Sequence, residues 1–371
     1  MPTVINRQSY PLLYCQRNPV RFVNVTGTVH ADLAHLNSPV RFVRLRDKED
    51  TLSAGEVMSA KEKIQWLSIL GHAKQQDTPR KIGLQSGGRS ALRFHPEYAL
   101  IRIKGGGFYT QQFSFDSETP YGGSLEFYVK REIENYEKLT KYAPQKLFPY
   151  KPVGWYDYEQ VFRGNKLYAG LFSIKGDTRL DEILVELTKT SYILKNGWSH
   201  KIVSICKHVD ELCFTLGKIA GLRLRQLANT GIPWSRRFSS SNAHIGNMVL
   251  YDDNGATTIG VVDLDAAGGF MKSKTKMQDL IKDQYDMILK DLINPVYTSL
   301  STDHILYNKG IVPGGYTLTG EGFIEGYRHG RTEYIKTTEI LRILANSLTC
   351  RNLWIAEMRE IYKKCLIDFR S

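Results

Sequence analysis

The segment from Ser239 to Phe270 constrains the fold more than any other stretch of the chain, because it combines a hairpin signal with polar residues at both open ends. Apolar and β-branched residues at Met248–Tyr251 and Thr257–Val262 flank an Asp-Asp-Asn-Gly turn, which predicts two antiparallel strands. Asn247 precedes the first strand and Asp263 follows the second, so we expect their side chains to meet. An amide oxygen and a carboxylate at adjacent strand ends can share Mg²⁺. The alternative is a surface hairpin with ordinary polar caps.

The residues around this hairpin resemble the catalytic and metal-binding loops of the protein-kinase-like superfamily. The segments Asn242–Asn247 (NAHIGN) and Val261–Asp265 (VVDLD) are most similar to the aminoglycoside phosphotransferase pattern H-G-D-x-H-x-x-N followed by I-D-F/W. The resemblance implies that Asn247 and Asp263 bind Mg²⁺ against nucleotide phosphates, and that Asp265 holds a second metal or orients the first. One position departs from the pattern: Asn242 stands where the family has its catalytic Asp. An amide cannot accept a proton as a carboxylate does.

A Gly-rich turn and a strand ending in lysine lie upstream of the hairpin. The turn at Gly87-Gly88 precedes the strands Ala91–Phe94 and Tyr98–Ile103, and Lys104 closes the second strand. The run A-L-I-R-I-K resembles the V-A-I-K strand of kinases. The glycine segment and the Lys-Gly-Gly-Gly run also resemble selenoprotein O, a kinase-like family that transfers AMP, although its T-P-Y-S-R segment is absent. Gly87, Gly88 and Lys104 are then expected to contact phosphates, whereas a plain hairpin turn is the alternative.

A helix and a hinge complete the kinase-like pattern. Apolar residues at helical spacing predict a helix from about Gly123 to Tyr142. The resemblance implies that a helix carboxylate holds Lys104 in place; Glu132 is the first candidate and Glu137 the second, although a carboxylate on a charged helix is usually only solvated. It also implies that the backbone around Phe172 and Ile174 binds the adenine edge of ATP.

Three further elements follow from local patterns. A capping box at Ser59 predicts a helix up to Gly71. The repeated Pro-Val-Arg-Phe-Val motif at residues 19–23 and 39–43 predicts two similar strands that pair with each other. A long apolar stripe predicts a continuous helix from about Ser199 to Leu227, with Cys206 and Cys213 in the core.

Composition limits the classes of protein that fit. The chain has 371 residues, of which 42% are hydrophobic and 24% charged, as in globular proteins. It has no apolar run of membrane-spanning length and no signal-peptide pattern. Five cysteines without metal-ligand spacing favour reduced thiols, and so a cytoplasmic protein. The net charge of +12 suits nucleotide phosphates, nucleic acid or an acidic protein face, but the basic residues are scattered.

The sequence therefore predicts an α+β, two-lobed kinase-like fold with a β-rich N-terminal extension. The expected parts are the extension at 1–80, an N-lobe at 81–175 and a helical C-lobe at 176–371. The expected function is Mg·ATP-dependent transfer of a phosphoryl or AMP group to a hydroxyl acceptor, with a protein favoured over a small molecule as the acceptor. Two alternatives stay open: a pseudokinase scaffold, favoured by Asn242, and a nucleic-acid-binding protein, favoured by the net charge. No membrane partner is expected.

Overall fold

The structure is a computed structural model, and the statements below concern the residues that it describes. These are residues 21–24, 41–43, 82–86, 90–95, 99–105, 124–162, 164–176, 178–184, 187, 208–234, 242–267, 274–293, 314–347, 349, 356 and 360. The predicted helix that begins at Ser59 and the Gly87-Gly88 turn lie outside them.

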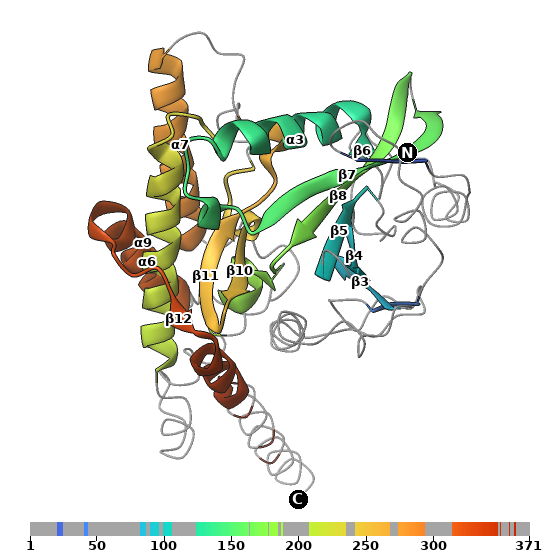
Figure 1. Cartoon of the computed structure of the whole chain (residues 1–371). Helices are drawn as coiled ribbons and strands as arrows, with labels where there is room; N and C mark the ends of the chain where they lie inside the picture. Colours follow the sequence, from blue (N-terminus) through green and yellow to red (C-terminus); the bar gives the residue numbers. More distant parts are fainter. Residues whose placement is uncertain are drawn as a thin grey trace, which may run out of the picture. The chain divides into compact units, whose positions relative to one another are not determined.

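The fold is α+β, with antiparallel sheets and helices in two compact units (Figure 1). The first unit comprises Met1–Asp177 and the segment Val262–Gly269. The second comprises Thr178–Val261 and Phe270–Ser371. The segment that carries Asp263 thus belongs to the first unit, together with the strand that ends in Lys104, although most of its sequence neighbours belong to the second.

The first unit is built on an eight-stranded sheet with the order β1-β7-β8-β5-β4-β3-β2, and β6 pairs with β8 beside this path. All described pairings are antiparallel except that of β2 with β3. The strands are β1 (Arg21–Asn24), β2 (Arg41–Val43), β3 (Ile82–Ser86), β4 (Ser90–His95), β5 (Ala99–Lys104), β6 (Ser124–Leu125), β7 (Tyr150–Phe162) and β8 (Asn165–Ile174).

The described Arg-Phe-Val parts of the two Pro-Val-Arg-Phe-Val motifs form strands, but the prediction that they pair with each other is wrong. β1 pairs with β7 at one end of the sheet order, and β2 pairs with β3 at the other end. The motif encodes extended backbone through its β-branched and aromatic residues. It does not encode the partner, because the ladder is made by backbone groups that every non-proline residue carries.

Helix α3 (Glu126–Leu139) packs on β7 and β8 and provides the helical part of this core. Figure 1 shows it running along these two strands. Its apolar face is formed by Val129, Ile133 and Leu139, which are at most 6% exposed. Burying a side chain of this size stabilises the fold by about 1.5–3 kcal/mol. The predicted helix is confirmed, and the short helix η2 (Gln145–Leu147) follows it.

The second unit contains a four-stranded antiparallel sheet with the order β12-β11-β10-β9. Its centre is the predicted hairpin, in which Met248 pairs with Val261 and Asp253 pairs with Ala256. Asn254 and Gly255 in the turn have φ values of 59° and 85°, which Asn and Gly tolerate best. The strands are β9 (Thr178–Arg179), β10 (Met248–Asp253), β11 (Ala256–Val261) and β12 (Ile335–Lys336).

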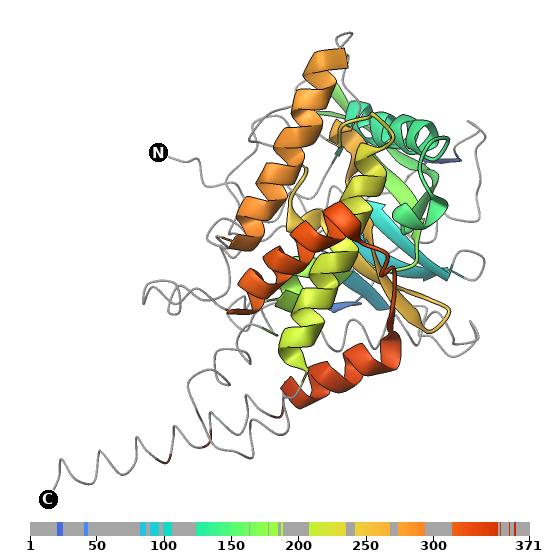
Figure 2. The same ribbon diagram turned by 90° about the vertical axis from the view of Figure 1, so that its left-hand side faces the viewer.

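Three long helices pack in this unit: α6 (Val209–Ala228), α7 (Lys274–Ile293) and α9 (Gly314–His329). Figure 2 shows α9, in orange-red, lying across α6, in yellow-green. The contact uses glycines on both helices. Gly217 and Gly221 of α6 lie against the backbone of α9, and Gly322 and Gly326 of α9 lie against that of α6. A Cβ at Gly221 would come within 2.6 Å of the Tyr327 nitrogen, so only glycine permits this approach.

The apolar stripe predicts one continuous helix from about Ser199, but residues 199–207, Cys206 among them, lie outside the described part of the chain. His208 adopts a left-handed backbone conformation with φ 79° and ψ 3°, so the helix begins at Val209. The predicted buried stripe beyond this point is confirmed, and Cys213 is fully buried.

Arg223 of α6 is also fully buried and joins the helix to the hairpin. Its Nε donates to the Ile259 carbonyl at 3.0 Å, and its Nη2 donates to the Thr258 hydroxyl at 2.7 Å.

Among the described helices, none is both long and apolar enough to cross a membrane.

Candidate functional site: a lysine among three carboxylates

Lys104 is the last residue of β5, an interior strand of the first unit. It lies in register with Ser90 of β4 and Gly170 of β8. Gly105 follows with φ 101°, and a Cβ at that position would come within 2.7 Å of the Tyr168 carbonyl oxygen. The strand therefore ends in a turn that only glycine fits comfortably. The Lys104 side chain is only 13% exposed, so its charge requires partners.

Glu132 of α3 is the first of these partners. Its Oε2 lies 2.7 Å from the Lys104 Nζ, and its side chain is 4% exposed. Glu132 lies on the buried side of α3 between Val129 and Ile133, whereas Glu137 is exposed. The structure thus brings the first sequence candidate, and not the second, to the lysine.

Asp263 and Asp265 supply the other two carboxylates. They lie in the segment after β11, on either side of Leu264 in the short helix η4 (Leu264–Ala266). Leu264 is fully buried, and its carbonyl accepts a hydrogen bond of 2.7 Å from the Asn135 side chain of α3. This contact fixes the acidic segment to the helix that carries Glu132. Asp263 has φ 66° and ψ 62°, a left-handed conformation that is uncommon outside glycine and is often found at functional sites.

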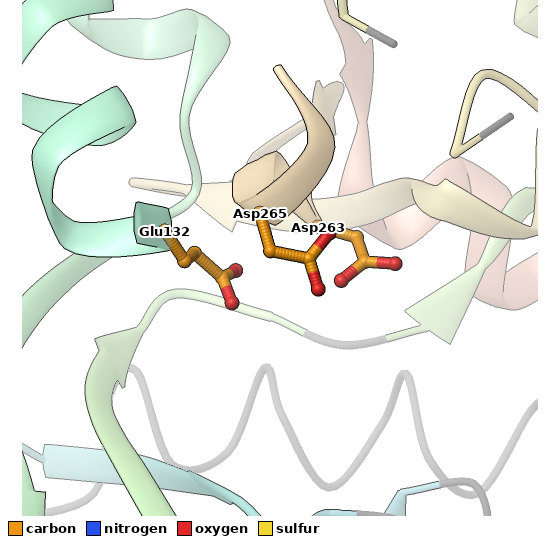
Figure 3. Close-up of side chains that lie close together, drawn as sticks. All are labelled: Glu132, Asp263 and Asp265. Atoms are coloured by element: carbon orange, nitrogen blue, oxygen red, sulfur yellow. The ribbon is translucent and has the colours of Figure 1, made fainter. Parts of the chain in front are cut away.

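The three carboxylates of Glu132, Asp263 and Asp265, here called the acidic triad, surround one ammonium group. The Lys104 Nζ forms ion pairs with Glu132 and Asp263 and lies 3.3 Å from Asp265 Oδ2. One oxygen atom from each carboxylate lies within 4.8 Å of the other two, which is close enough for one cation. Figure 3 shows Glu132 reaching from its helix towards the two aspartates on the η4 segment.

The pKa values follow from burial and from these neighbours. Burial lowers the pKa of Lys104, but the carboxylates of Asp263, Asp265 and Glu132 outweigh it and raise that pKa above its ordinary value. Burial raises the pKa of Glu132, and the two aspartates add to this effect against the opposing effect of Lys104. Lys104 is therefore a fixed cation at neutral pH and not a proton acceptor.

Tyr150 of β7 is a member of this environment that the sequence did not reveal. It is 5% exposed, and its hydroxyl has no hydrogen-bond partner among the described residues. Burial raises the pKa of Tyr150 well above its ordinary value, and Glu132, Asp263 and Asp265 raise it further. Its ring packs on Tyr136 and Phe172, at 5.5 and 5.4 Å between ring centroids. No local pattern marks Tyr150, because its position depends on the β7–β8 register.

Phe172 and Ile174, the predicted adenine-binding positions, both lie on β8. The Phe172 side chain is 2% exposed and belongs to the core. The backbone of Phe172 has strand neighbours on both sides, Arg102 of β5 and Pro152 of β7. Ile174 is paired with Tyr150 of β7, and the described β5 pairing stops one residue earlier, at Ser173. Ile174 is thus the better placed of the two for a backbone contact, and the adenine role stays a prediction.

Asn242 and Asn247 lie in the second unit, at the entry to the hairpin. Asn247 is 8% exposed and ends the short helix η3 (Ile245–Asn247). Its Nδ2 donates to the Asn242 carbonyl at 3.0 Å. Its Oδ1, the predicted metal ligand, accepts from Arg179 at 3.3 Å. Arg179 also donates to the Gly246 carbonyl at 2.9 Å, so this arginine, which the sequence did not single out, orders the segment.

Asp291 of α7 supports the same segment. It is 5% exposed, it accepts a hydrogen bond from the Ile245 backbone, and its Oδ2 has no hydrogen-bond partner among the described residues. Burial, with a further contribution from Asp181, raises the pKa of Asp291 to about 6.

The structure places Lys104, Glu132, Asp263 and Asp265 together in the first unit, and Asn242 with Asn247 in the second. The predicted meeting of Asn247 with Asp263 stays a prediction. Gly87 and Gly88 lie outside the described residues. Neither a scan against protein-family models nor a search of curated proteins finds a match to this chain.

Proposed function

We propose that this chain is a Mg·ATP-dependent transferase with a two-lobed kinase-like fold, moving a phosphoryl or AMP group to a hydroxyl of a protein in the cytoplasm. The observation that carries the proposal is the binding of Lys104 by Glu132 and by Asp263. These residues lie 28 and 159 positions from the lysine in the chain. A strand lysine, a helix glutamate and an aspartate after a hairpin are the parts that kinase-like enzymes use to hold nucleotide phosphates and metal.

The donor set fits the proposed ligands. An ammonium group binds phosphate oxygens through short, charge-assisted hydrogen bonds. Carboxylate oxygens are the ligands that Mg²⁺ prefers, and the acidic triad offers three carboxylates within reach of one cation. When bound, Mg·ATP supplies the transferable group and the metal charge that offsets negative charge on the phosphates.

The residues of the chain then have distinct tasks. Glu132 holds Lys104 at the site where the phosphates bind, and the buried setting strengthens the electrostatic interaction of the lysine with them. Asp263 and Asp265 provide metal ligands, and the left-handed backbone of Asp263 is held by the Leu264–Asn135 anchor. Asn247 is the predicted ligand from the second unit. Asn242 offers an amide where a carboxylate would act as base, so transfer relies on positioning and electrostatics.

Intact-mass spectrometry after incubation with Mg·ATP tests the proposal directly. We expect the wild-type chain, alone or with a mixture of protein acceptors, to yield a product heavier by a phosphoryl or by an AMP group. Lys104→Met and Asp263→Asn should abolish the product. Lys130→Met is the matched control, because Lys130 is an exposed α3 residue whose partner is Glu126. Loss of product in the control as well would argue against a specific role of Lys104.

A pseudokinase scaffold is the second candidate, and the Asn242 amide favours it. This reading predicts nucleotide binding without any covalent product, under every acceptor condition. Nucleotide binding that needs Lys104, combined with an unchanged mass, would therefore favour the scaffold over the transferase.

A further inference from the structure

The Lys104 ammonium lies where a metal ion would be expected among the three carboxylates. Its Nζ lies 2.7 Å from Glu132 and 3.3 Å from Asp265, and it forms an ion pair with Asp263 as well. The same three carboxylates can converge on one cation. The carboxylates that a divalent cation would use are thus already bound to a cation that the chain itself supplies.

The lysine brings one positive charge to the three carboxylates of the triad. Taken alone, the three carboxylates and the ammonium group sum to a charge of −2, and Glu132 and Lys104 are largely buried. A divalent cation would bring two positive charges where the lysine brings one, so the triad attracts it more strongly than a single ammonium group. The lysine has one advantage over a dissolved ion, because it is tethered to β5 and its local concentration is high.

Tyr150 provides a second observation that points to a ligand. Its hydroxyl is buried, it lies within electrostatic reach of Glu132, Asp263 and Asp265, and it has no hydrogen-bond partner among the described residues. A buried hydroxyl without a partner costs free energy, and such groups in folded proteins call for an explanation. A ligand at the triad, or a water molecule on a bound ion, would supply the missing partner.

We propose that the acidic triad is a divalent-cation site whose built-in occupant is Lys104, so that lysine and metal compete for the same three carboxylates. The inference rests on the proposed function and adds its regulation. A polyphosphate that binds the Lys104 ammonium draws it from the triad, and the metal then enters. The Tyr150 hydroxyl donates a hydrogen bond to the bound group. Metal and nucleotide consequently bind together, and metal alone binds weakly.

The test measures Mn²⁺ binding to the full chain without any nucleotide, by electron paramagnetic resonance of the free ion. We expect weak binding by the wild type. Lys104→Met should tighten binding by about tenfold or more, with one ion per chain, because the competing charge is gone. Adding Asp265→Asn to Lys104→Met should remove this tight site. Adding Tyr150→Phe instead should weaken it severalfold, as expected for the loss of one buried hydrogen bond.

Two further variants test whether a gain in Mn²⁺ affinity comes from removing the lysine from the triad. The alternatives are a change in overall charge and a loss of folding. Lys104→Met with Glu132→Gln keeps the summed charge of the cluster at −2 and removes one carboxylate together with the lysine. It should fold and still bind Mn²⁺ more tightly than the wild type. Lys130→Met removes a positive charge from the exposed face of α3 and should leave the Mn²⁺ affinity unchanged.

The inference is overturned if neither Lys104 variant binds Mn²⁺ more tightly than the wild type. It is also overturned if Lys130→Met tightens binding as much as Lys104→Met, since the effect would then be general electrostatics. Failure here is distinguishable from failure of the proposed function. If the wild-type chain binds Mg·ATP but the Lys104 variants gain no Mn²⁺ affinity, the proposed nucleotide site stands. Only the proposed competition between lysine and metal then fails.

Discussion

The Lys104 ammonium and the Glu132 carboxylate lie 2.7 Å apart, and both side chains are almost completely removed from solvent. A buried pair of this kind is a weak contributor to stability, because desolvation offsets most of the attraction. In this structure the pair holds the lysine at the acidic triad.

Lys104→Met should weaken ATP binding by about tenfold or more and leave adenosine binding nearly unchanged, because a charge-assisted contact to phosphate is worth about 1.5–3 kcal/mol. Isothermal titration calorimetry with both ligands measures the difference. Lys130→Met is the control. Equal weakening of ATP and adenosine binding would identify Lys104 as a purely structural residue.

Asp263→Asn should remove the part of nucleotide binding that depends on Mg²⁺. Asparagine tolerates the left-handed conformation of this position, so the backbone is preserved while the charge is lost. The measurement is the rise in melting temperature caused by ATP, with Mg²⁺ and with a chelator. Asp286→Asn, on the exposed side of α7, is the control. A variant whose ATP response still depends on Mg²⁺ would exclude Asp263 as a ligand.

Asn242→Asp should lower Mg·ATP-dependent transfer, because the added charge would repel phosphates in an enzyme that does not use a base at this position. Transfer is followed with ATP labelled separately in the α- and γ-phosphate. A general base contributes about 10²–10⁴-fold in rate. A gain of that size in γ-phosphate transfer would instead mark the natural chain as a disabled kinase.

Asp291→Asn should stabilise the protein at pH 7.5 and have little effect near pH 4. Burial raises the pKa of Asp291 to about 6, whereas the ordinary value is 3.8. Between these values the folded state binds more protons than the unfolded state, so the free energy of unfolding falls as the pH rises through this window. The charged form costs roughly 3 kcal/mol at neutral pH. The asparagine oxygen can still accept from Ile245.

Urea unfolding at several pH values checks this prediction, with Asp286→Asn as the control on the same helix. If the Asp291→Asn variant is less stable than the wild type at pH 7.5, other groups in the folded protein stabilise the charged form of Asp291.

Gly217→Ala should destabilise the second unit even though alanine is the better helix former. The gain in helix propensity is about 1 kcal/mol. The added Cβ would overlap the Thr319 carbonyl and lie 2.8 Å from the Phe323 nitrogen, so α6 and α9 must separate. Overpacking of this kind costs about 1–3 kcal/mol and sometimes more. Thermal melting measures the loss, and Glu321→Ala, exposed on α9, is the control. A higher melting temperature for Gly217→Ala would contradict the close packing.

The elements with local signals could be predicted from the sequence. The hairpin was marked by its turn, and α3 by its apolar spacing. Lys104, Glu132 and Asp263 could be proposed because a family pattern orders them along the chain. The sequence did not reveal that Asp265 and Asp263 both bind the lysine, since this depends on how η4 packs on α3.

The features that the sequence did not predict also depend on tertiary packing or on backbone conformation. Tyr150 and Arg179 have ordinary sequence surroundings, and only tertiary packing gives them their partners. His208 interrupts an apolar stripe without the glycine or proline that usually marks a break. The sequence predicted the wrong pairing partners for β1 and β2, because strand propensity depends on local residues whereas strand pairing depends on the tertiary fold.

The segment Val262–Gly269 leaves the second unit to complete the first, and this sets a limit on how such a protein can be dissected or recombined. A fragment that ends at Asp177 keeps Lys104 and Glu132 but lacks the other two counter-ions of the lysine. A chimera with a crossover anywhere between Thr178 and Val261 would join a lysine from one parent to aspartates from another. The first unit therefore cannot be exchanged between proteins as one continuous segment, because the carboxylates that neutralise Lys104 come from two separate parts of the sequence.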